Sequence, residues 1–129
     1  MLTPAQLKTI ATARIDDAQA LFDKARYDGA VYLCGYAIEL ALKCRVCTTL
    51  NWLDFPESPK EFGGLASLKT HDLKTLLRFT GVEAAVGSMP EWLAVLDWSP
   101  QDRYKPIGSA TVTSAQLMLN STRAILGAL

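Results

Sequence analysis

Residues 29–48, GAVYLCGYAIELALKCRVCT, decide the fold of this chain. Apolar residues cover nearly the whole circumference of a helix built from this stretch, and a helix that is apolar all round belongs in the middle of a bundle. The stretch contains Glu39, Lys43 and Arg45 and falls short of the roughly 20 apolar residues that a membrane span needs, so we expect no membrane association. Gly35 has no side chain, and we expect a neighbouring helix to approach it closely.

The residues before this stretch predict an amphipathic first helix. Thr3, Pro4 and Gln6 form a helix start, with a hydroxyl cap, a proline where no donor is needed, and a glutamine that reaches back to the cap. Apolar residues then recur every three or four positions up to residue 25. We expect a break at residues 27–29, with Asp28 as the cap of the second helix, so that the first two helices run antiparallel.

Shorter helices and loops follow the second helix. Residues 51–69 contain two prolines and two glycines without periodicity and predict the longest loop. Thr70 is the expected cap of a short helix, Pro90 the start of another, and Thr113 with Gln116 a capping box for the last helix. Residues 107–113 are rich in strand-forming residues, but no second alternating run exists to pair with them.

These patterns predict one domain over residues 1–129. Its fold class is all-α: an antiparallel up-and-down bundle of four to five helices around the buried second helix. The thirteen basic residues balance thirteen acidic ones, which excludes a strong overall positive field. An odd count of three cysteines indicates a reducing compartment, and residues 1–6 lack the pattern of a signal peptide, so we expect a cytoplasmic protein.

Two cysteines and the single histidine are the first candidates for chemistry. Cys44 and Cys47 form a CxxC, but zinc prefers four ligands, and Cys34 and His71 would have to supply the others. We therefore favour core packing of the thiols and expect no metal and no cofactor. His71 is the only residue with a near-neutral pKa by default and could act as a general base. The simpler reading, which we prefer, is that it orders its loop by bonding a carbonyl or a carboxylate.

A polar cluster in the predicted loop after residue 98 is the second candidate. It combines two cations with an aromatic ring, a set that can grip a phosphate and stack on a base: Arg103, Tyr104 and Lys105. The alternative, which the sequence alone favours, is that Arg103 pairs with Asp97 or Asp102 while Tyr104 closes the end of the bundle. Glu39 and Lys43, four residues apart on a helix, can also pair.

Three segments together resemble one protein family. Residues 26–43 (RYDGAVYLCGYAIELALK), 71–73 (HDL) and 98–106 (WSPQDRYKP) resemble the HEPN family, the higher eukaryotes and prokaryotes nucleotide-binding domains. The resemblance implies an antiparallel helical bundle that is commonly a homodimer. It also implies a place beside a minimal nucleotidyltransferase partner, or in toxin–antitoxin and defence systems.

Many members of that family are metal-independent ribonucleases that use an arginine and a histidine near the start of the last long helix. The histidine can deprotonate a 2′-hydroxyl, and the arginine can stabilise the charge that grows on the phosphate. Arg103 resembles the motif's arginine. The positions where the histidine would stand hold Gly108, Ser109 and Ala110, so the motif is incomplete here.

Three functions follow as hypotheses. The first is a noncatalytic HEPN-type protein that binds a nucleotide, an RNA or a nucleotidyltransferase partner through Arg103, Tyr104 and Lys105, with outer contacts from His71, Glu39 and Lys43. The second is a metal-independent ribonuclease that combines Arg103 with a nonstandard base, His71. The third is a protein-interaction module whose exposed apolar anchors are Trp52, Phe55 and Trp92.

Overall fold

The computed structural model describes residues 2–57, 65 and 70–129. Their helices are, in order, α1 (Pro4–Asp23), α2 (Tyr27–Leu50), α4 (Leu73–Arg78), α5 (Glu83–Gly87), α6 (Pro90–Val95), the 3-10 helix η2 (Pro100–Tyr104) and α7 (Val112–Ala128). Across this part of the chain the only β pairing is an isolated bridge between Leu2 and Phe55. The predicted all-α bundle is confirmed, and residues 107–113 form no strand. Most of the predicted loop at residues 51–69 lies outside the described residues.

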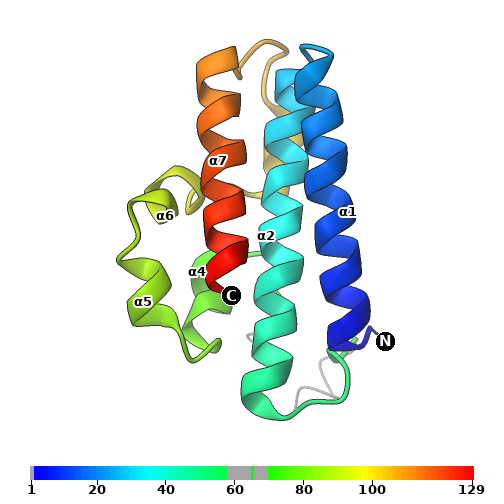
Figure 1. Cartoon of the computed structure of the whole chain (residues 1–129), viewed down its shortest axis with the longest axis vertical. Helices are drawn as coiled ribbons and strands as arrows, with labels where there is room; N and C mark the ends of the chain where they lie inside the picture. The colour runs from blue at the N-terminus through cyan, green and yellow to red at the C-terminus, as the bar shows by residue number, and fades with distance from the viewer. Residues whose placement is uncertain (1, 58–64, 66–69) are drawn as a thin grey trace.

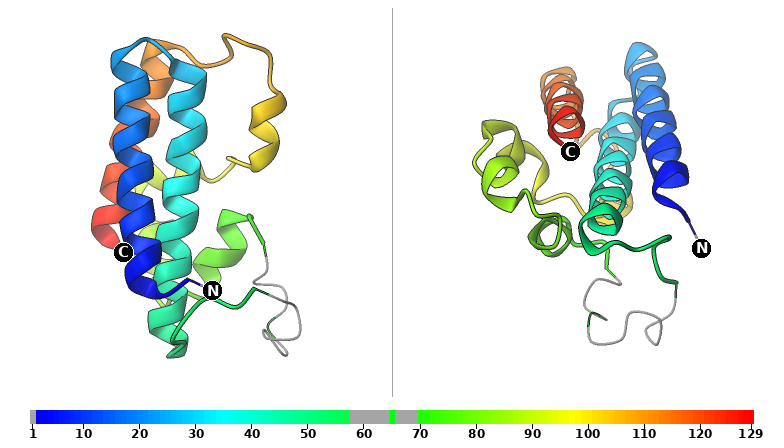
Figure 2. Two further views of the ribbon diagram at one scale, coloured as in Figure 1. Left: turned by 90° about the vertical axis from the view of Figure 1, so that its right-hand side faces the viewer. Right: turned by 60° about the horizontal axis from the view of Figure 1, so that its bottom comes forward.

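Three long helices make the body of the bundle (Figure 1). α1 and α2 run antiparallel, and α7 lies beside α2 and runs in the same direction as it. The short helices α4, α5 and α6 return the chain between the end of α2 and the start of α7, as Figure 2 shows from two other sides. The described residues therefore contain six α-helices rather than four or five. α5 was not expected, because a helix of five residues is too short to show a periodic pattern.

α2 occupies the centre of the bundle, as the sequence predicts. Its buried side chains include Cys34, Ile38, Leu42 and Val46, none of which has measurable exposure. One side of the helix departs from the predicted apolar circumference, because the larger side chains there are polar. That polar side faces the short helices and the segments between them, and it positions the candidate site described below.

Gly35 allows the close approach that the sequence predicts, but the neighbour is not a helix. The indole ring of Trp98, in the segment between α6 and η2, packs directly on Gly35, and a Cβ atom there would overlap the ring. Trp98 is itself buried. The contact joins the centre of α2 to the chain segment that leads into η2.

The start of α1 is confirmed and the starts of three other helices are shifted. Thr3 and Gln6 form the predicted capping box. α2 begins at Tyr27, directly after a left-handed turn at Ala25, so Asp28 lies in the first turn instead of capping the helix.

Two further caps were assigned to the wrong residue. Asp72 caps α4, while the Thr70 hydroxyl accepts a hydrogen bond from the backbone N–H of Asp72. α7 begins with Thr111 and Ser114 as its capping box, two residues before the predicted pair. In each case several hydroxyl or carboxylate side chains lie within two residues of each other, and any of them can cap.

Candidate functional site

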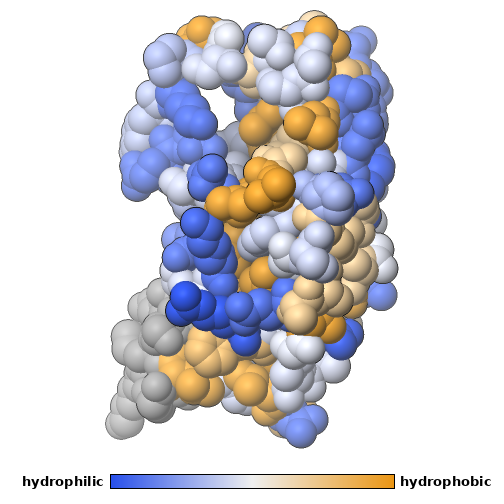
Figure 3. Space-filling view, turned by 90° about the vertical axis from the view of Figure 1, so that its left-hand side faces the viewer, coloured by the Kyte–Doolittle hydropathy of each residue, from blue (hydrophilic) through white to orange (hydrophobic). Residues whose placement is uncertain are grey.

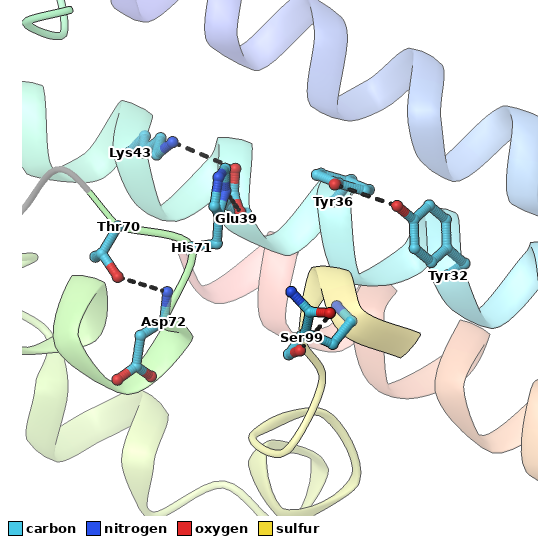
Figure 4. Close-up of polar contacts among 9 residues, drawn as sticks. Tyr32, Tyr36, Glu39, Lys43, Thr70, His71, Asp72 and Ser99 are labelled. Carbon is cyan, nitrogen blue, oxygen red and sulfur yellow. Dashed lines mark hydrogen bonds and ion pairs between the residues drawn. The ribbon is translucent and has the colours of Figure 1, made fainter. Parts of the chain in front are cut away.

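Four polar side chains lie in a row along α2, and we call them the polar stripe. They are Tyr32, Tyr36, Glu39 and Lys43, whose spacing of three or four residues places them on one face of the helix. Figure 4 shows the row, with His71 approaching from the segment before α4. Each end of the stripe meets residues from elsewhere in the chain.

Glu39 is the centre of the first cluster. Its side chain is only 4% exposed, and both of its carboxylate oxygens are paired. Lys43 Nζ donates to one oxygen at 3.3 Å, and His71 Nδ1 donates to the other at 2.7 Å. The structure thus contains the predicted pairing of Glu39 with Lys43, and His71 bonds a carboxylate, as in the simpler of its two predicted roles.

The local chain conformation holds His71 against α2. Residues on either side of it form a turn, with the backbone N–H of Asp72 bonded to the Thr70 hydroxyl at 2.9 Å, and Asp72 then caps α4. The His71 side chain remains 59% exposed. Its other ring nitrogen, Nε2, has no hydrogen-bond partner among the described residues. A carboxylate on Nδ1 holds the ring in one orientation, and in the neutral imidazole that donates from Nδ1 the nitrogen without a proton is Nε2, which is the arrangement that a general base requires.

Aromatic rings form the middle of the site. The hydroxyls of Tyr32 and Tyr36 lie 3.3 Å apart, and the Trp98 ring meets Tyr36 edge-on with 4.9 Å between centroids. The hydrogen bond to Tyr32, followed by burial, raises the pKa of Tyr36 to about 12. The charges of Glu39 and Arg103 both act on this tyrosine, so it lies between the two polar clusters.

Arg103 is the centre of the second cluster. Its guanidinium lies 4.7 Å from the centre of the Tyr104 ring, and hydrogen bonding to Tyr104, then to Tyr32, raises its pKa. Lys105 Nζ is 3.5 Å from an Asp102 carboxylate oxygen. The alternative that the sequence favours is therefore wrong: within the described chain Arg103 pairs with no carboxylate, and Tyr104 is 71% exposed and closes nothing. Both residues are exposed, and η2, which carries them, lies to one side of the long helices (Figure 2).

A cleft of about 540 Å³ opens beside this cluster, between the first half of α2, η2 and the start of α7. Arg103, Lys105 and Tyr32 supply polar groups to its lining, and Ile107 and Leu117 are among the apolar ones. Figure 3 shows a hollow on the side of the molecule where α6 and α7 lie, with hydrophobic side chains gathered below it. Ile107 and Leu117 are exposed, so the cleft has an apolar rim.

Asp28, on α2, binds the segment before α7 that forms part of the cleft lining. Its two carboxylate oxygens accept hydrogen bonds from the backbone N–H groups of Gly108 at 2.7 Å and Ala110 at 2.8 Å. These bonds, first the one from Ala110, lower the pKa of Asp28. The sequence analysis missed this role, because no local pattern reports a contact between residues that are about 80 positions apart.

The cysteines pack as hydrophobic residues. Cys34 and Cys47 are fully buried, and burial is the largest of the causes that raise the pKa of each thiol to about 11. Cys44 is half-buried and donates a hydrogen bond from Sγ to the Pro4 carbonyl at 3.3 Å. All three thiols are free. No group of three potential metal ligands comes together within the described residues.

The predicted anchors of a protein-interaction module are not exposed. Trp92 and Phe55 are only 6% and 8% exposed, and Trp52 is half-buried. Trp52 packs edge-on against Phe55, and both belong to the hydrophobic core or lie against it. They contribute to folding, which explains why large apolar residues occur there. The interaction module loses its proposed contact surface.

The six predicted site residues thus form two clusters rather than one. Glu39, Lys43 and His71 meet at one end of the polar stripe, and Arg103 and Lys105 line the cleft at the other end, with Tyr104 beside Arg103. No helix in the described part of the chain is long and apolar enough to cross a membrane. Comparisons of the chain with protein-family models, with curated proteins and with solved structures give no match.

Proposed function

We propose that this chain is a noncatalytic HEPN-type domain that binds a nucleotide-bearing ligand, a nucleotide or an RNA, by its phosphate in the cleft beside η2. The observation that carries the proposal is that Arg103, which has no carboxylate partner among the residues described, lines a cleft of about 540 Å³. Clefts of this size hold small molecules, and a guanidinium binds phosphate oxygens in pairs.

The surrounding charges favour an anion in this place. Asp28 and Asp102 also line the cleft, but two backbone N–H groups satisfy Asp28, and Lys105 pairs with Asp102. The charge of Arg103 remains to be neutralised. The exposed Tyr104 ring beside it offers a surface on which a base can stack, and stacking of this kind tolerates any base.

Isothermal titration tests this proposal. ATP, GTP and a short RNA are titrated into the wild-type chain, into Arg103→Gln and into a control, Arg78→Gln, which removes another exposed arginine, on α4. We expect Arg103→Gln to weaken binding by about tenfold or more, as the loss of one charge-assisted contact does, and the control to match the wild type. Absence of heat with every ligand would remove the proposal.

The resemblance to the HEPN family also supports a proposal about the oligomeric state and the partner of the domain. We include in the proposal that the chain forms a homodimer in the cytoplasm, with a minimal nucleotidyltransferase as partner, in a toxin–antitoxin or defence system. Light scattering after gel filtration tests the dimer. Co-expression with a nucleotidyltransferase encoded beside it tests the partner, since a stable pair elutes as one stoichiometric complex.

A second candidate function is cleavage of RNA, and the contact between Glu39 and His71 favours it. In this reaction Nε2 of His71 takes the proton of a 2′-hydroxyl, the oxygen attacks the adjacent phosphorus, and the 5′-oxygen leaves with a proton from solvent. Arg103 would stabilise the phosphate charge. It lies at the other end of the polar stripe from His71, so this candidate needs the two residues to come from different protomers of a dimer.

Cleavage of labelled RNA in the presence of EDTA tests the second candidate. We would compare the wild type with His71→Ala and with Glu39→Gln, which keeps the volume of the side chain but removes the charge that orients the imidazole. The candidate requires activity that falls strongly in His71→Ala and partly in Glu39→Gln. Equal activity, or none in any of the three, ends it.

A further inference from the structure

A second hollow, of about 700 Å³, lies in the opposite half of the bundle from the cleft. Its walls are the first turns of α1, the second half of α2 and the last turn of α7. Figure 1 shows α7 ending beside α2 while α1 and α2 continue past it, so the wall that α7 forms is shorter than the other two. The hollow shares no residue with the cleft at η2.

Small side chains create this space. Ala5, Ala11, Ala41 and Gly127 line it, and a Cβ atom added at Gly127 would meet nothing within 4 Å. Leu126 and Leu129 add apolar wall on the side of α7. A volume of this size, mostly apolar and with a few polar groups, is typical of sites for small molecules.

The charged side chains of the lining have the same sign. Lys8 and Arg45 are the only charged side chains that line the hollow, and neither has an ion pair with a carboxylate in the described residues. Both cations lower the pKa of the Cys44 thiol, although burial, the larger effect, raises it. Their fields therefore reach the wall of the hollow, in a chain whose net charge is zero.

We propose that this hollow binds a small anionic amphiphile, with a single carboxylate or phosphate head between Lys8 and Arg45 and a short unbranched tail against the alanines. The simplest alternative is that the two cations only balance the negative end of the α7 dipole. Against it, Arg45 Nε donates a hydrogen bond to the Thr80 carbonyl at 3.4 Å, and Thr80 lies outside α7. Lys8 bonds no α7 carbonyl in this part of the chain.

Protection of Cys44 from alkylation reads out occupancy directly, because this half-buried thiol lines the hollow while the other two are buried. The probes are octanoate and octyl phosphate, which distinguish the two heads, and octylammonium, which has the same tail and the opposite charge. We expect one or both anions to slow Cys44 alkylation in a saturable way and octylammonium to have no effect. Equal protection by octylammonium, or no protection by either anion, would overturn the proposal.

Two variants test the assignment to these residues. Lys8→Glu reverses one exposed charge at the hollow, and Lys24→Glu makes the same change beyond the other end of α1, so we expect about tenfold weaker anion binding in the first only. Ala41→Phe fills the space and should abolish protection while leaving nucleotide titration at η2 unchanged. Equal effects of the two charge reversals would contradict the site, whatever the outcome for the nucleotide.

Discussion

Nδ1 of His71 donates a hydrogen bond to Oε1 of Glu39 at 2.7 Å across 32 residues of sequence. The carboxylate is buried in the central helix, and a buried carboxylate is tolerated only when its charge is paired and hydrogen-bonded. Lys43 supplies the second partner. The contact therefore does two things, since it satisfies Glu39 and also holds the segment before α4 against α2.

Replacing Glu39 by alanine should lower the free energy of unfolding by about 2 kcal/mol, because the change leaves Lys43 half-buried without its partner and releases His71. We expect less than for a fully buried pair, since His71 is mostly exposed. Urea unfolding measures the change. Glu83→Ala, at an exposed position in α5, should stay within about 0.5 kcal/mol of the wild type. Similar losses in the two variants would show that the buried pairing contributes little.

Replacing glycine by alanine should have opposite effects on stability at two positions. Gly35→Ala places a methyl group inside the Trp98 ring and should cost about 2 kcal/mol or more, because the indole must move out of a packed core. Gly127→Ala meets no atom and should stabilise α7 by up to about 1 kcal/mol. Thermal unfolding followed by circular dichroism distinguishes them, and a harmless Gly35→Ala would contradict the packing described here.

Local patterns predicted the long helices, and long-range contacts account for what they missed. The capping box at Thr3 and the apolar run of α2 are signals contained within one helix, so both could be read directly. The partner of Glu39 on α2 was also predictable, because Lys43 is one turn away. Asp28 could not be understood without the loop at Gly108, which reaches it only in the folded chain.

The same distinction explains the errors at the candidate site. Arg103 has acidic neighbours in the sequence, and proximity along the chain suggested a pair. In the structure η2 turns the guanidinium toward Tyr104 and Tyr32 instead. The large aromatic residues were misread for a different reason. Trp92 was predicted to be an exposed anchor but lies in the core, and residue type alone does not distinguish these two positions.

Asp28 should make stability depend on pH in the acid range. Its folded-state pKa is lowered by the bonds from Ala110 and Gly108, so its contribution is present above the ordinary aspartate pKa and is lost as the pH falls through the lowered value. Asp28→Asn should lower the melting temperature at neutral pH and flatten its fall in acid. Asp97→Asn, a control at an exposed position, should keep the slope of the wild type. A wild-type slope in Asp28→Asn would contradict this role.

The three thiols should react with iodoacetamide at separate rates. Cys44 is half-buried and should be alkylated first, at mildly alkaline pH. Cys34 and Cys47 are fully buried with pKa values of about 11, so little thiolate forms and the reagent reaches it only when the structure opens. Peptide mapping by mass spectrometry over time measures each rate.

Destabilising the fold through Glu39→Ala should speed the alkylation of Cys34 and Cys47 and leave that of Cys44 almost unchanged, because only the first two reactions require opening of the core. Rapid alkylation of Cys47 in the intact wild type would show that the second half of α2 is not packed as described.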